Sequence, residues 1–263
     1  MVYGVHMAIF EFQGTNIGYS MEGTGAPILA FHGTTQAANA WDQVKAACTE
    51  PRTWVVCEFP GSGESSMPVG PIDLEQFISG AVALMGSLGF SQFHVVGYSL
   101  GAVTALKTAS LHPSHVLSAT SLCGWSQSDA RMRVTFDLWR RLIAIDPALF
   151  MRYAVADGYS VPTIEMLEPM IDTVASMGAV TVQPGSDAHL ELDLRVDIEA
   201  DLDRISCPCL IIGGRFDRWV DFSKSEHIAS RVKGARLVGL PAGHLVISEL
   251  SGEIAQEIIS HTS

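Results

Sequence analysis

A serine stands between two glycines in Gly97-Tyr98-Ser99-Leu100-Gly101, which fits the pattern G-x-S-x-G. Glycines at these two positions allow a backbone turn so tight that the serine lies at its tip with an exposed hydroxyl. Val95-Val96 before the turn indicates a buried parallel strand, and residues 103–111 after it form an apolar helical pattern. The first N–H groups of that helix, and its positive dipole end, would lie beside the serine oxygen. This context favours Ser99 as a nucleophile.

A serine hydroxyl is a weak nucleophile, so it needs a base within hydrogen-bond reach and a third group that orients this base. The chain has nine histidines. His244 stands apart because it lies in Leu240-Pro241-Ala242-Gly243-His244, directly after a predicted strand. Loops that follow parallel strands meet at one edge of the sheet, where the turn around Ser99 also lies. We therefore expect His244 to be the base and the other histidines to be surface or structural residues.

A carboxylate is the expected third group, because it would hold the tautomer of the histidine and stabilise the imidazolium that forms. Asp217 fits this role, since it follows a predicted strand in Gly213-Gly214-Arg215-Phe216-Asp217. Two alternatives stay open but rank lower. Asp129 follows another predicted strand, and Asp221 lies one helical turn beyond Asp217.

Attack on a carbonyl group produces an oxyanion, which needs N–H donors aimed at it. Leu100 supplies one N–H from the serine turn itself. The second should come from the loop after the predicted strand at residues 27–31, where Thr34 follows His32-Gly33. We expect His32 to order this loop and to border the substrate pocket rather than to take protons.

Short apolar strands alternate with helical patterns along most of the chain, which indicates a mostly parallel sheet covered on both faces. The strand before Ser99 is one of them, and the other predicted strands cover residues 8–13, 17–21, 27–31, 53–58, 116–122, 209–213 and 236–240. Outside the segment described next, the predicted helices cover residues 41–47, 74–88, 103–111, 223–232 and 246–259. Asp73 and Gln76 are typical of a capping box at the start of the second helix.

The pattern changes between residues 126 and 204, where no strand-like run occurs. Helical patterns cover residues 131–145, 147–156, 162–177 and 188–202 instead. We interpret residues 126–204 as a helical cap, or lid, inserted into a core domain formed by residues 1–125 and 205–263. Because the insertion connects two parallel strands, it would lie above the serine at the carboxyl ends of the strands.

Several segments occur in the order found in the α/β-hydrolase superfamily and together resemble its motifs: His32-Gly33, Pro60-Gly61-Ser62-Gly63-Glu64-Ser65, Gly97-Tyr98-Ser99-Leu100-Gly101, Gly214-Arg215-Phe216-Asp217 and Gly243-His244. The chain most resembles the branch of small esterases, C–C bond hydrolases, cofactor-free haloperoxidases and homoserine-acetyltransferase-like enzymes. The resemblance implies a mostly parallel sheet of about eight strands, helices on both faces and a helical lid. It also implies Ser99 as nucleophile, Asp217 as acid and His244 as base. One departure is Glu58, since the family commonly has aspartate there.

The composition limits the classes of partner that the protein can bind. Of its 263 residues, 48% are hydrophobic, and the net charge of -12 argues against nucleic acid and anionic membranes as partners. No apolar run reaches membrane-spanning length, and Glu11 interrupts the N-terminal stretch where a signal peptide would be apolar. The five scattered cysteines, including Cys207-Pro208-Cys209, lack zinc-site spacing and favour free thiols. We expect a cytoplasmic protein that binds a small molecule and neither a metal nor another cofactor. A homodimer is an open alternative.

Large apolar side chains of the predicted lid are candidates for a substrate pocket: Phe136, Trp139, Phe150, Met151, Tyr153, Met166, Met170 and Met177. Most of them would serve equally well to dock the lid on the core. We assign Phe136 and Trp139 to the pocket, together with His32, Trp219 and Leu245. A set of basic lid residues fits either an acidic substrate or solvated helix faces: Arg131, Arg133, Arg140, Arg141 and Arg152.

These residues predict a serine hydrolase that cleaves a carboxylic ester, thioester or lactone of a small, largely apolar substrate through an acyl-enzyme on Ser99. Hydrolysis of a C–C bond in a diketone is an alternative, because Arg215 and Trp219 resemble the residues that such enzymes carry beside their acid. A thioesterase or cyclase of secondary metabolism is another. A protein that kept the fold and binds a ligand without turnover would not need Ser99, Asp217 and His244 together.

Overall fold

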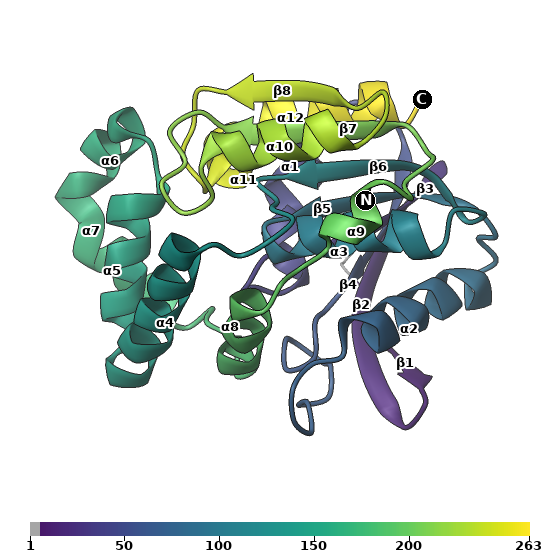
Figure 1. Cartoon of the computed structure of the whole chain (residues 1–263). Coiled ribbons are helices and arrows are strands. Elements are labelled where there is room, and N and C mark those ends of the chain that lie inside the picture. Colours follow the sequence, from purple (N-terminus) through teal and green to yellow (C-terminus); the bar gives the residue numbers. More distant parts are fainter. Residues whose placement is uncertain (1–5) are drawn as a thin grey trace.

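The computed structural model describes residues 6–263, so the first five residues of the predicted core domain lie outside the description. Within this range the chain forms a sheet of eight strands flanked by helices (Figure 1). In spatial order the strands are β1 (His6–Phe12), β2 (Thr15–Gly23), β4 (Arg52–Cys57), β3 (Ala26–Phe31), β5 (Phe93–Tyr98), β6 (Val116–Leu122), β7 (Cys209–Gly214) and β8 (Arg236–Leu240). Only β1 and β2 pair antiparallel to their neighbours. The predicted, mostly parallel sheet is confirmed.

The central strands are buried on both faces, because alternate residues point into two apolar clusters. Val95 belongs to the first cluster, which is covered by α2 (Leu74–Ser87), α3 (Leu100–Leu111) and α10 (Phe222–Arg231). Val96 belongs to the second, which is covered by η1 (Ala38–Trp41), α1 (Asp42–Ala47), α11 (Val246–Glu249) and α12 (Ser251–His261). Helices therefore cover both faces of the sheet, as predicted.

A helical insertion connects β6 to β7, and α4 to α7 of this insertion lie at the left of the sheet in Figure 1. Its elements are α4 (Ala130–Ile145), α5 (Pro147–Gly158), α6 (Val161–Leu167), η2 (Glu168–Met170), α7 (Ile171–Ala179), α8 (Ser186–Leu194) and α9 (Glu199–Leu202). The single helix predicted at residues 162–177 is wrong, because Pro169 lacks an N–H and the segment divides at η2. The helix predicted at residues 188–202 is also wrong, because an antiparallel bridge between Gln127 and Asp197 interrupts it.

The helix ends agree with the sequence in part. Asp73 caps α2, since its side chain accepts hydrogen bonds from the N–H groups of Glu75 and Gln76. The Gln76 side chain donates to Gln13 instead of closing the predicted capping box. The predicted final helix is divided into α11 and α12 at Leu250, where φ is -135°. Among residues 6–263, no helix is long and apolar enough to cross a membrane.

Candidate active site

Ser99 lies at the tip of a sharp turn between β5 and α3, with φ of 55° and ψ of -119°. A positive φ is unfavourable for a residue with a side chain, so the surrounding structure must enforce it. The flanking glycines are needed because the backbone passes too close for a side chain. A Cβ on Gly97 would lie 1.8 Å from the Gly101 carbonyl oxygen, and one on Gly101 would lie 2.2 Å from that of Phe31. A hydrogen bond of 2.9 Å from the Ser99 N–H to the Leu122 carbonyl anchors the turn to β6.

The structure brings Ser99, His244 and Asp217 into one hydrogen-bonded series. His244 Nε2 lies 3.0 Å from Ser99 Oγ, and His244 Nδ1 lies 2.6 Å from Asp217 Oδ2. The other carboxylate oxygen, Asp217 Oδ1, accepts from the N–H groups of Trp219 at 2.9 Å and Val220 at 2.8 Å. With a proton on Nδ1 directed at Asp217, the imidazole presents an unprotonated Nε2 to the serine hydroxyl. None of the three residues is more than 7% exposed, so little water competes for these bonds.

Three loops at the carboxyl edge of the sheet supply these side chains, from the ends of β5, β7 and β8. Two further side chains brace the histidine loop. Tyr98 Oη donates to the His244 carbonyl oxygen at 3.1 Å, and Glu249 Oε1 accepts from the Gly243 N–H at 2.7 Å. Glu249 also accepts from the Ser160 hydroxyl between α5 and α6, which ties this loop to the insertion.

The alternative acids, Asp129 and Asp221, lie at helix N-termini, where short acidic side chains are favoured. Asp129 accepts from the Met132 N–H at the start of α4 and forms an ion pair of 2.8 Å with Lys224. Asp221 accepts from the Ser223 N–H at 3.0 Å at the start of α10. In the described structure neither carboxylate bonds to the imidazole, so the geometry favours Asp217.

The two candidate oxyanion donors border the serine. Leu100 is the first residue of α3, so its N–H has no partner within the helix. Thr34 lies in the turn after β3 and lines the same cavity as Ser99. Thr35 continues this turn with a positive φ of 66°, a conformation that needs support from its neighbours.

Two pocket assignments are wrong, because His32 and Phe136 do not line the cavity. His32 is fully buried, its Nδ1–H donates to the Gly33 carbonyl oxygen at 2.8 Å, and its Nε2 accepts from the Phe59 N–H at 3.1 Å. Burial lowers the pKa of His32 to about 3, so the imidazole stays neutral and orders the loop. Phe136 is 3% exposed and packs edge-on against Trp139 with ring centroids 5.4 Å apart.

The cavity beside Ser99 has a volume of about 100 Å³. Trp139, Trp219 and Leu245 line it, as the sequence analysis proposed. The Trp219 ring lies between the insertion and the imidazole, with its centroid 4.4 Å from that of Trp139 and 5.0 Å from that of His244. Phe150 and Met151, which the sequence offered as pocket candidates, also line it. The remaining lining residues include four that no sequence pattern indicated: Gln36, Ala154, Thr181 and Val182.

Other insertion side chains of predicted interest face solvent. Met166, Met170 and Met177 are 69%, 54% and 68% exposed, so they belong neither to the cavity nor to the core. The basic side chains of the insertion do not line the cavity, which favours solvated helix faces over a site for an acidic substrate. Each of them bonds to a nearby group instead: Arg140 to Asp187, Arg141 to Asp137, Arg152 to Asp172, and Arg131 and Arg133 to backbone carbonyl oxygens.

Arg215 does not line the Ser99 cavity. Its guanidinium lies over the ring of Phe222, 4.8 Å from the centroid. It lines a separate outer cavity of about 500 Å³ together with Arg218 and Asp221. This position gives no support to a role for Arg215 in diketone chemistry at the serine.

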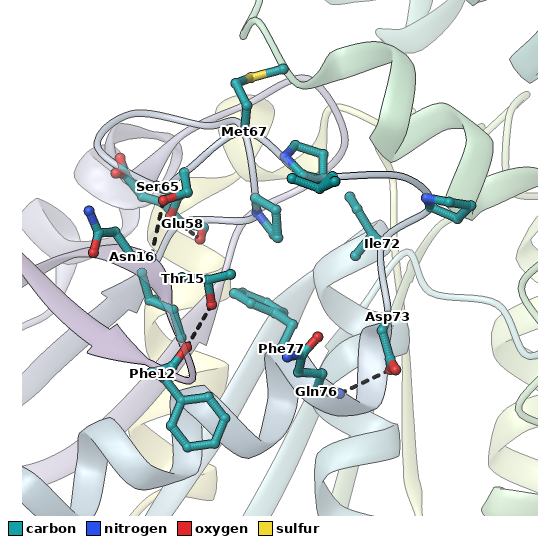
Figure 2. A pocket seen from close by; sticks show the side chains of 16 residues that line it. Phe12, Thr15, Asn16, Glu58, Ser65, Met67, Ile72, Asp73, Gln76 and Phe77 are labelled. Atoms are coloured by element: carbon teal, nitrogen blue, oxygen red, sulfur yellow. Dashed lines mark hydrogen bonds between the residues drawn. The ribbon is translucent and has the colours of Figure 1, made fainter.

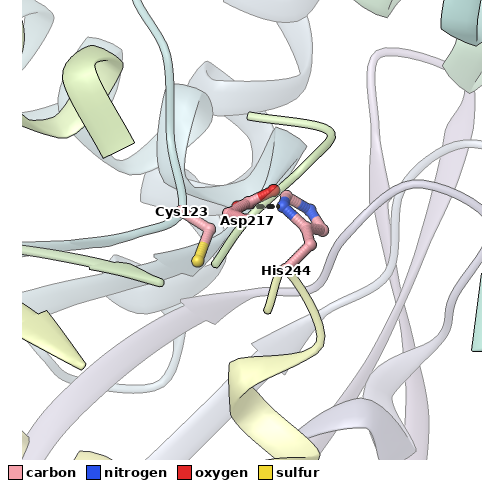
Figure 3. A group of neighbouring side chains, drawn as sticks. All are labelled: Cys123, Asp217 and His244. Atoms are coloured by element: carbon pink, nitrogen blue, oxygen red, sulfur yellow. Dashed lines mark hydrogen bonds and ion pairs between the residues drawn. The ribbon is translucent and has the colours of Figure 1, made fainter. Parts of the chain in front are cut away.

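Cys123 lies next to Asp217 and His244 (Figure 3), and one potential ligand atom of each lies within 4.8 Å of the others. Burial raises the pKa of the Cys123 thiol, whereas a metal-binding cysteine must be a thiolate. The carboxylate and the imidazole are already bonded to each other. The group therefore fits the serine–histidine–acid series better than a metal centre, and the absence of a metal stays a prediction.

A second cavity, of about 270 Å³, lies between the β1–β2 hairpin, the start of α2 and the loop after Pro60 (Figure 2). It shares no lining residue with the Ser99 cavity. Its polar side chains bond locally, since Thr15 Oγ1 donates to the Phe12 carbonyl at 2.8 Å and Asp73 accepts from the Gln76 N–H at 3.0 Å. Its lining residues contain no nucleophile paired with a base, so we locate the chemistry at Ser99.

Comparisons with known proteins agree with this architecture. Residues 26–162 match the family described as alpha/beta hydrolase fold. The pyrrolizixenacetamide deacetylase of Xenorhabdus hominickii is 28% identical over 234 residues, covering 87% of this chain and 88% of that protein. A hydrolase from Pseudomonas aeruginosa superposes with a TM-score of 0.84 at 24% identity, covering 98% of each chain. The enol-lactonase from Burkholderia xenovorans superposes with a TM-score of 0.83 at 19% identity, covering 97% of this chain and 99% of its own.

Proposed function

Because the chain belongs to the alpha/beta hydrolase fold family, as its motifs predicted, we propose that it is a serine hydrolase acting through an acyl-enzyme on Ser99. The proposed substrate is a carboxylic ester, thioester or lactone with a small, largely apolar acyl group. The hydrogen-bonded series of 3.0 Å and 2.6 Å from Ser99 through His244 to Asp217 supports this proposal most strongly. A binding protein without turnover would have no use for such a series.

In the proposed acylation step, Ser99 Oγ attacks the carbonyl carbon while its proton passes to His244 Nε2. The imidazolium that forms is stabilised by Asp217, which the Trp219 and Val220 N–H groups hold in place. The N–H groups proposed as oxyanion donors belong to Thr34 and Leu100. The tetrahedral intermediate then collapses, and the proton from His244 goes to the departing alcohol, thiol or lactone oxygen.

In the proposed deacylation step, a water molecule attacks the ester carbonyl of the acyl-enzyme. His244 Nε2 accepts a proton from this water and later returns it to Ser99 Oγ, so the free acid leaves and the serine is restored. No group besides the protein and water takes part in this balance.

The acyl group should be short. The cavity beside Ser99 measures about 100 Å³, whereas pockets for drug-sized ligands measure roughly 300 to 1,000 Å³. Aromatic and aliphatic side chains, among them Trp139, Trp219 and Leu245, form its apolar wall. We further propose that residues 126–204 act as the lid of a core formed by residues 1–125 and 205–263, since the insertion supplies Trp139, Met151 and Val182 to this wall.

A fluorophosphonate probe and a substrate panel test the proposal. We expect a single covalent adduct on Ser99 by peptide mass spectrometry, and faster hydrolysis of nitrophenyl acetate than of nitrophenyl octanoate. The panel should add a thioester, a lactone and a diketone, which separate the proposed reaction from thioesterase and C–C hydrolase alternatives. Failure of both labelling and hydrolysis would rule out a serine hydrolase, and labelling that persists in Ser99→Ala would rule out this nucleophile.

Amide deacetylation is a second candidate, because the Xenorhabdus relative named as a deacetylase is 28% identical over 87% of this chain. An amide passes through the same tetrahedral intermediate, but its leaving amine must receive a proton, which His244 could supply. Paired O-acetyl and N-acetyl derivatives of one aromatic scaffold separate the two candidates. A higher kcat/KM on the N-acetyl compound would replace the ester proposal with a deacetylase.

A further inference from the structure

Asp193 is a fully buried carboxylic acid on α8 that the proposed mechanism does not use. Its Oδ2 accepts a hydrogen bond of 2.7 Å from Thr34 Oγ1, across 159 positions of sequence. Its other oxygen, Oδ1, has no hydrogen-bond partner among the described residues. The residue therefore joins the insertion directly to the loop that carries one proposed oxyanion donor.

His189, one turn earlier on α8, contacts the same loop. Its Nδ1 accepts from the Thr35 N–H at 3.4 Å, and its Nε2–H donates to the Pro60 carbonyl oxygen at 2.9 Å. Burial lowers the pKa of His189 to about 4, so this imidazole is neutral at ordinary pH. Thr34 and Thr35 are thus held by two side chains of one helix, which offsets the unfavourable positive φ of Thr35.

The charged and titratable groups around Asp193 make their bonds elsewhere. On its own segment, His189 is neutral and Arg195 donates to the Ile72 carbonyl at 3.0 Å. Three neighbouring elements also carry titratable groups. The loop after β3 contributes His32, which is neutral, and α4 contributes Arg133, which donates to the Ser128 carbonyl oxygen. Helix α3 contributes Lys107, which forms ion pairs with Glu75 and Asp201. No cation therefore neutralises Asp193 among the residues that the structure describes.

An ionised carboxylate in this position would be a buried charge with a single hydrogen bond, which is costly. The neutral acid can occupy the same position at a much lower cost. Burial accordingly raises the pKa of Asp193 from 3.8 to about 8.

We propose that Asp193 is a positioning residue that holds Thr34 in its place at the oxyanion site and does so as a neutral acid. This inference rests on the proposed serine hydrolase activity. An ionised Asp193 would place a negative charge behind the N–H group that stabilises a developing negative charge, and so would slow acylation. The neutral acid fixes the loop without this penalty.

The first experiment compares kcat against pH for the wild-type protein and Asp193→Asn, on nitrophenyl acetate. Asparagine has the same shape and can accept the Thr34 hydroxyl, but it does not ionise. The ratio of kcat between variant and wild type should be constant below pH 7 and rise roughly tenfold by pH 9.5. Asp201→Asn is the matched control, because Asp201 is 7% exposed but paired with Lys107, and its ratio should stay flat.

Asp193→Ala separates positioning from simple packing. It removes the bond to Thr34, so kcat should fall roughly tenfold with little change in KM, and Asp193→Asn should restore most of the loss. A flat ratio for Asp193→Asn across the alkaline range would overturn the neutral-acid inference. An unchanged kcat in Asp193→Ala would overturn the positioning role.

Thermal unfolding supplies a readout that needs no activity. Because the folded-state pKa of Asp193 lies above that of an unfolded aspartate, the contribution of Asp193 to folding stability falls as pH rises from about 4 to 8 and then levels off. The Tm of Asp193→Asn relative to wild type should therefore increase through this range. A constant difference would refute the neutral acid. An inactive wild-type protein that still shows the increase would refute the proposed function while leaving the protonation state of Asp193 intact.

Discussion

Asp217 and Asp193 are both buried carboxyl groups at the candidate site, but their partners differ. Asp217 is 6% exposed and accepts from His244, Trp219 and Val220, all of which belong to loops after sheet strands. Asp193 is 0% exposed and accepts from Thr34 alone, and it reaches that residue from the helical insertion. The two acids are therefore similarly buried, but Asp217 has three hydrogen-bond donors and Asp193 has one.

Both oxygens of Asp217 have hydrogen-bond donors, whereas one oxygen of Asp193 has none among the described residues. This difference divides the site into two halves with different supports. The serine, histidine and acid are positioned by the sheet, with Glu249 as a link to the insertion. The Thr34 loop is positioned by α8, so a displacement of the insertion would disturb the oxyanion half more than the nucleophilic half.

The largest expected effect is in the nucleophilic half. Ser99→Ala removes the attacking oxygen, so kcat on nitrophenyl acetate should fall by roughly 10⁵ to 10⁶. Circular dichroism and Tm should match wild type, because alanine fits wherever the serine side chain does. A variant that keeps more than a hundredth of the activity would mean that the measured hydrolysis occurs elsewhere.

Asp217→Asn should lower kcat by about 10⁴, because the amide no longer holds the productive histidine tautomer. The matched control is Asp129→Asn, which alters an acid that caps α4 and pairs with Lys224. It should change kcat less than threefold and affect only helix stability. If the two variants exchanged these outcomes, the acid of the site would have been misassigned.

Within the oxyanion half, His189 should lose its stabilising contribution in acid, which is opposite in sign to the effect of Asp193. The pKa of His189 is lowered to about 4 in the folded protein, so the unfolded chain binds a proton first as pH falls from 6.5. Its contribution to the free energy of unfolding is present above pH 6.5 and is lost toward pH 4, by about 3 kcal/mol.

His189→Gln keeps an N–H donor for Pro60 but does not titrate in this range. Urea unfolding at pH 7 and pH 4.5 should show a smaller acid-dependent loss for this variant than for wild type. His227→Gln serves as the control, since His227 lies at the surface and pairs with Glu199. An equal loss in wild type and His189→Gln would place the acid sensitivity outside α8.

The smallest expected effect concerns acyl length. Met151→Ala removes a flexible side chain from the cavity wall, and each extra methylene accommodated is worth about tenfold in specificity. The ratio of kcat/KM for nitrophenyl propionate, which has one methylene more, over acetate should therefore rise about tenfold. Met166→Ala, on the exposed face of α6, should leave the ratio unchanged. An unchanged ratio for Met151→Ala would mean that acyl chains do not enter this cavity.

The nucleophilic half was predictable because strand and turn patterns place Ser99, Asp217 and His244 at strand ends, which meet at one edge of a parallel sheet. Each was therefore fixed by local sequence plus a general rule of topology. The sequence also predicted the sheet itself and the N-cap of α2, because alternation and capping are local properties.

The oxyanion half and the cavity wall were not predictable in the same way. The bond between Thr34 and Asp193 joins residues 159 positions apart, and neither residue type signals it. Phe136 was assigned to the cavity because aromatic content shows that a helix has an apolar face but not which side chain borders a void. Pro169 is different, because a proline is visible in the sequence and its lack of an N–H group should have led us to divide the predicted helix there.

The two chain segments that connect the insertion to the sheet are paired with each other, which has a consequence for protein engineering. Gln127 and Asp197 form a bridge where the insertion leaves and rejoins the sheet, and β6 and β7 on either side are neighbours. A foreign cap could therefore be grafted at these two segments without breaking a strand pair. If the insertion acts as the proposed lid, such a graft should change acyl preference, and the proposed role of Asp193 requires that the graft also bring a neutral partner for the Thr34 hydroxyl.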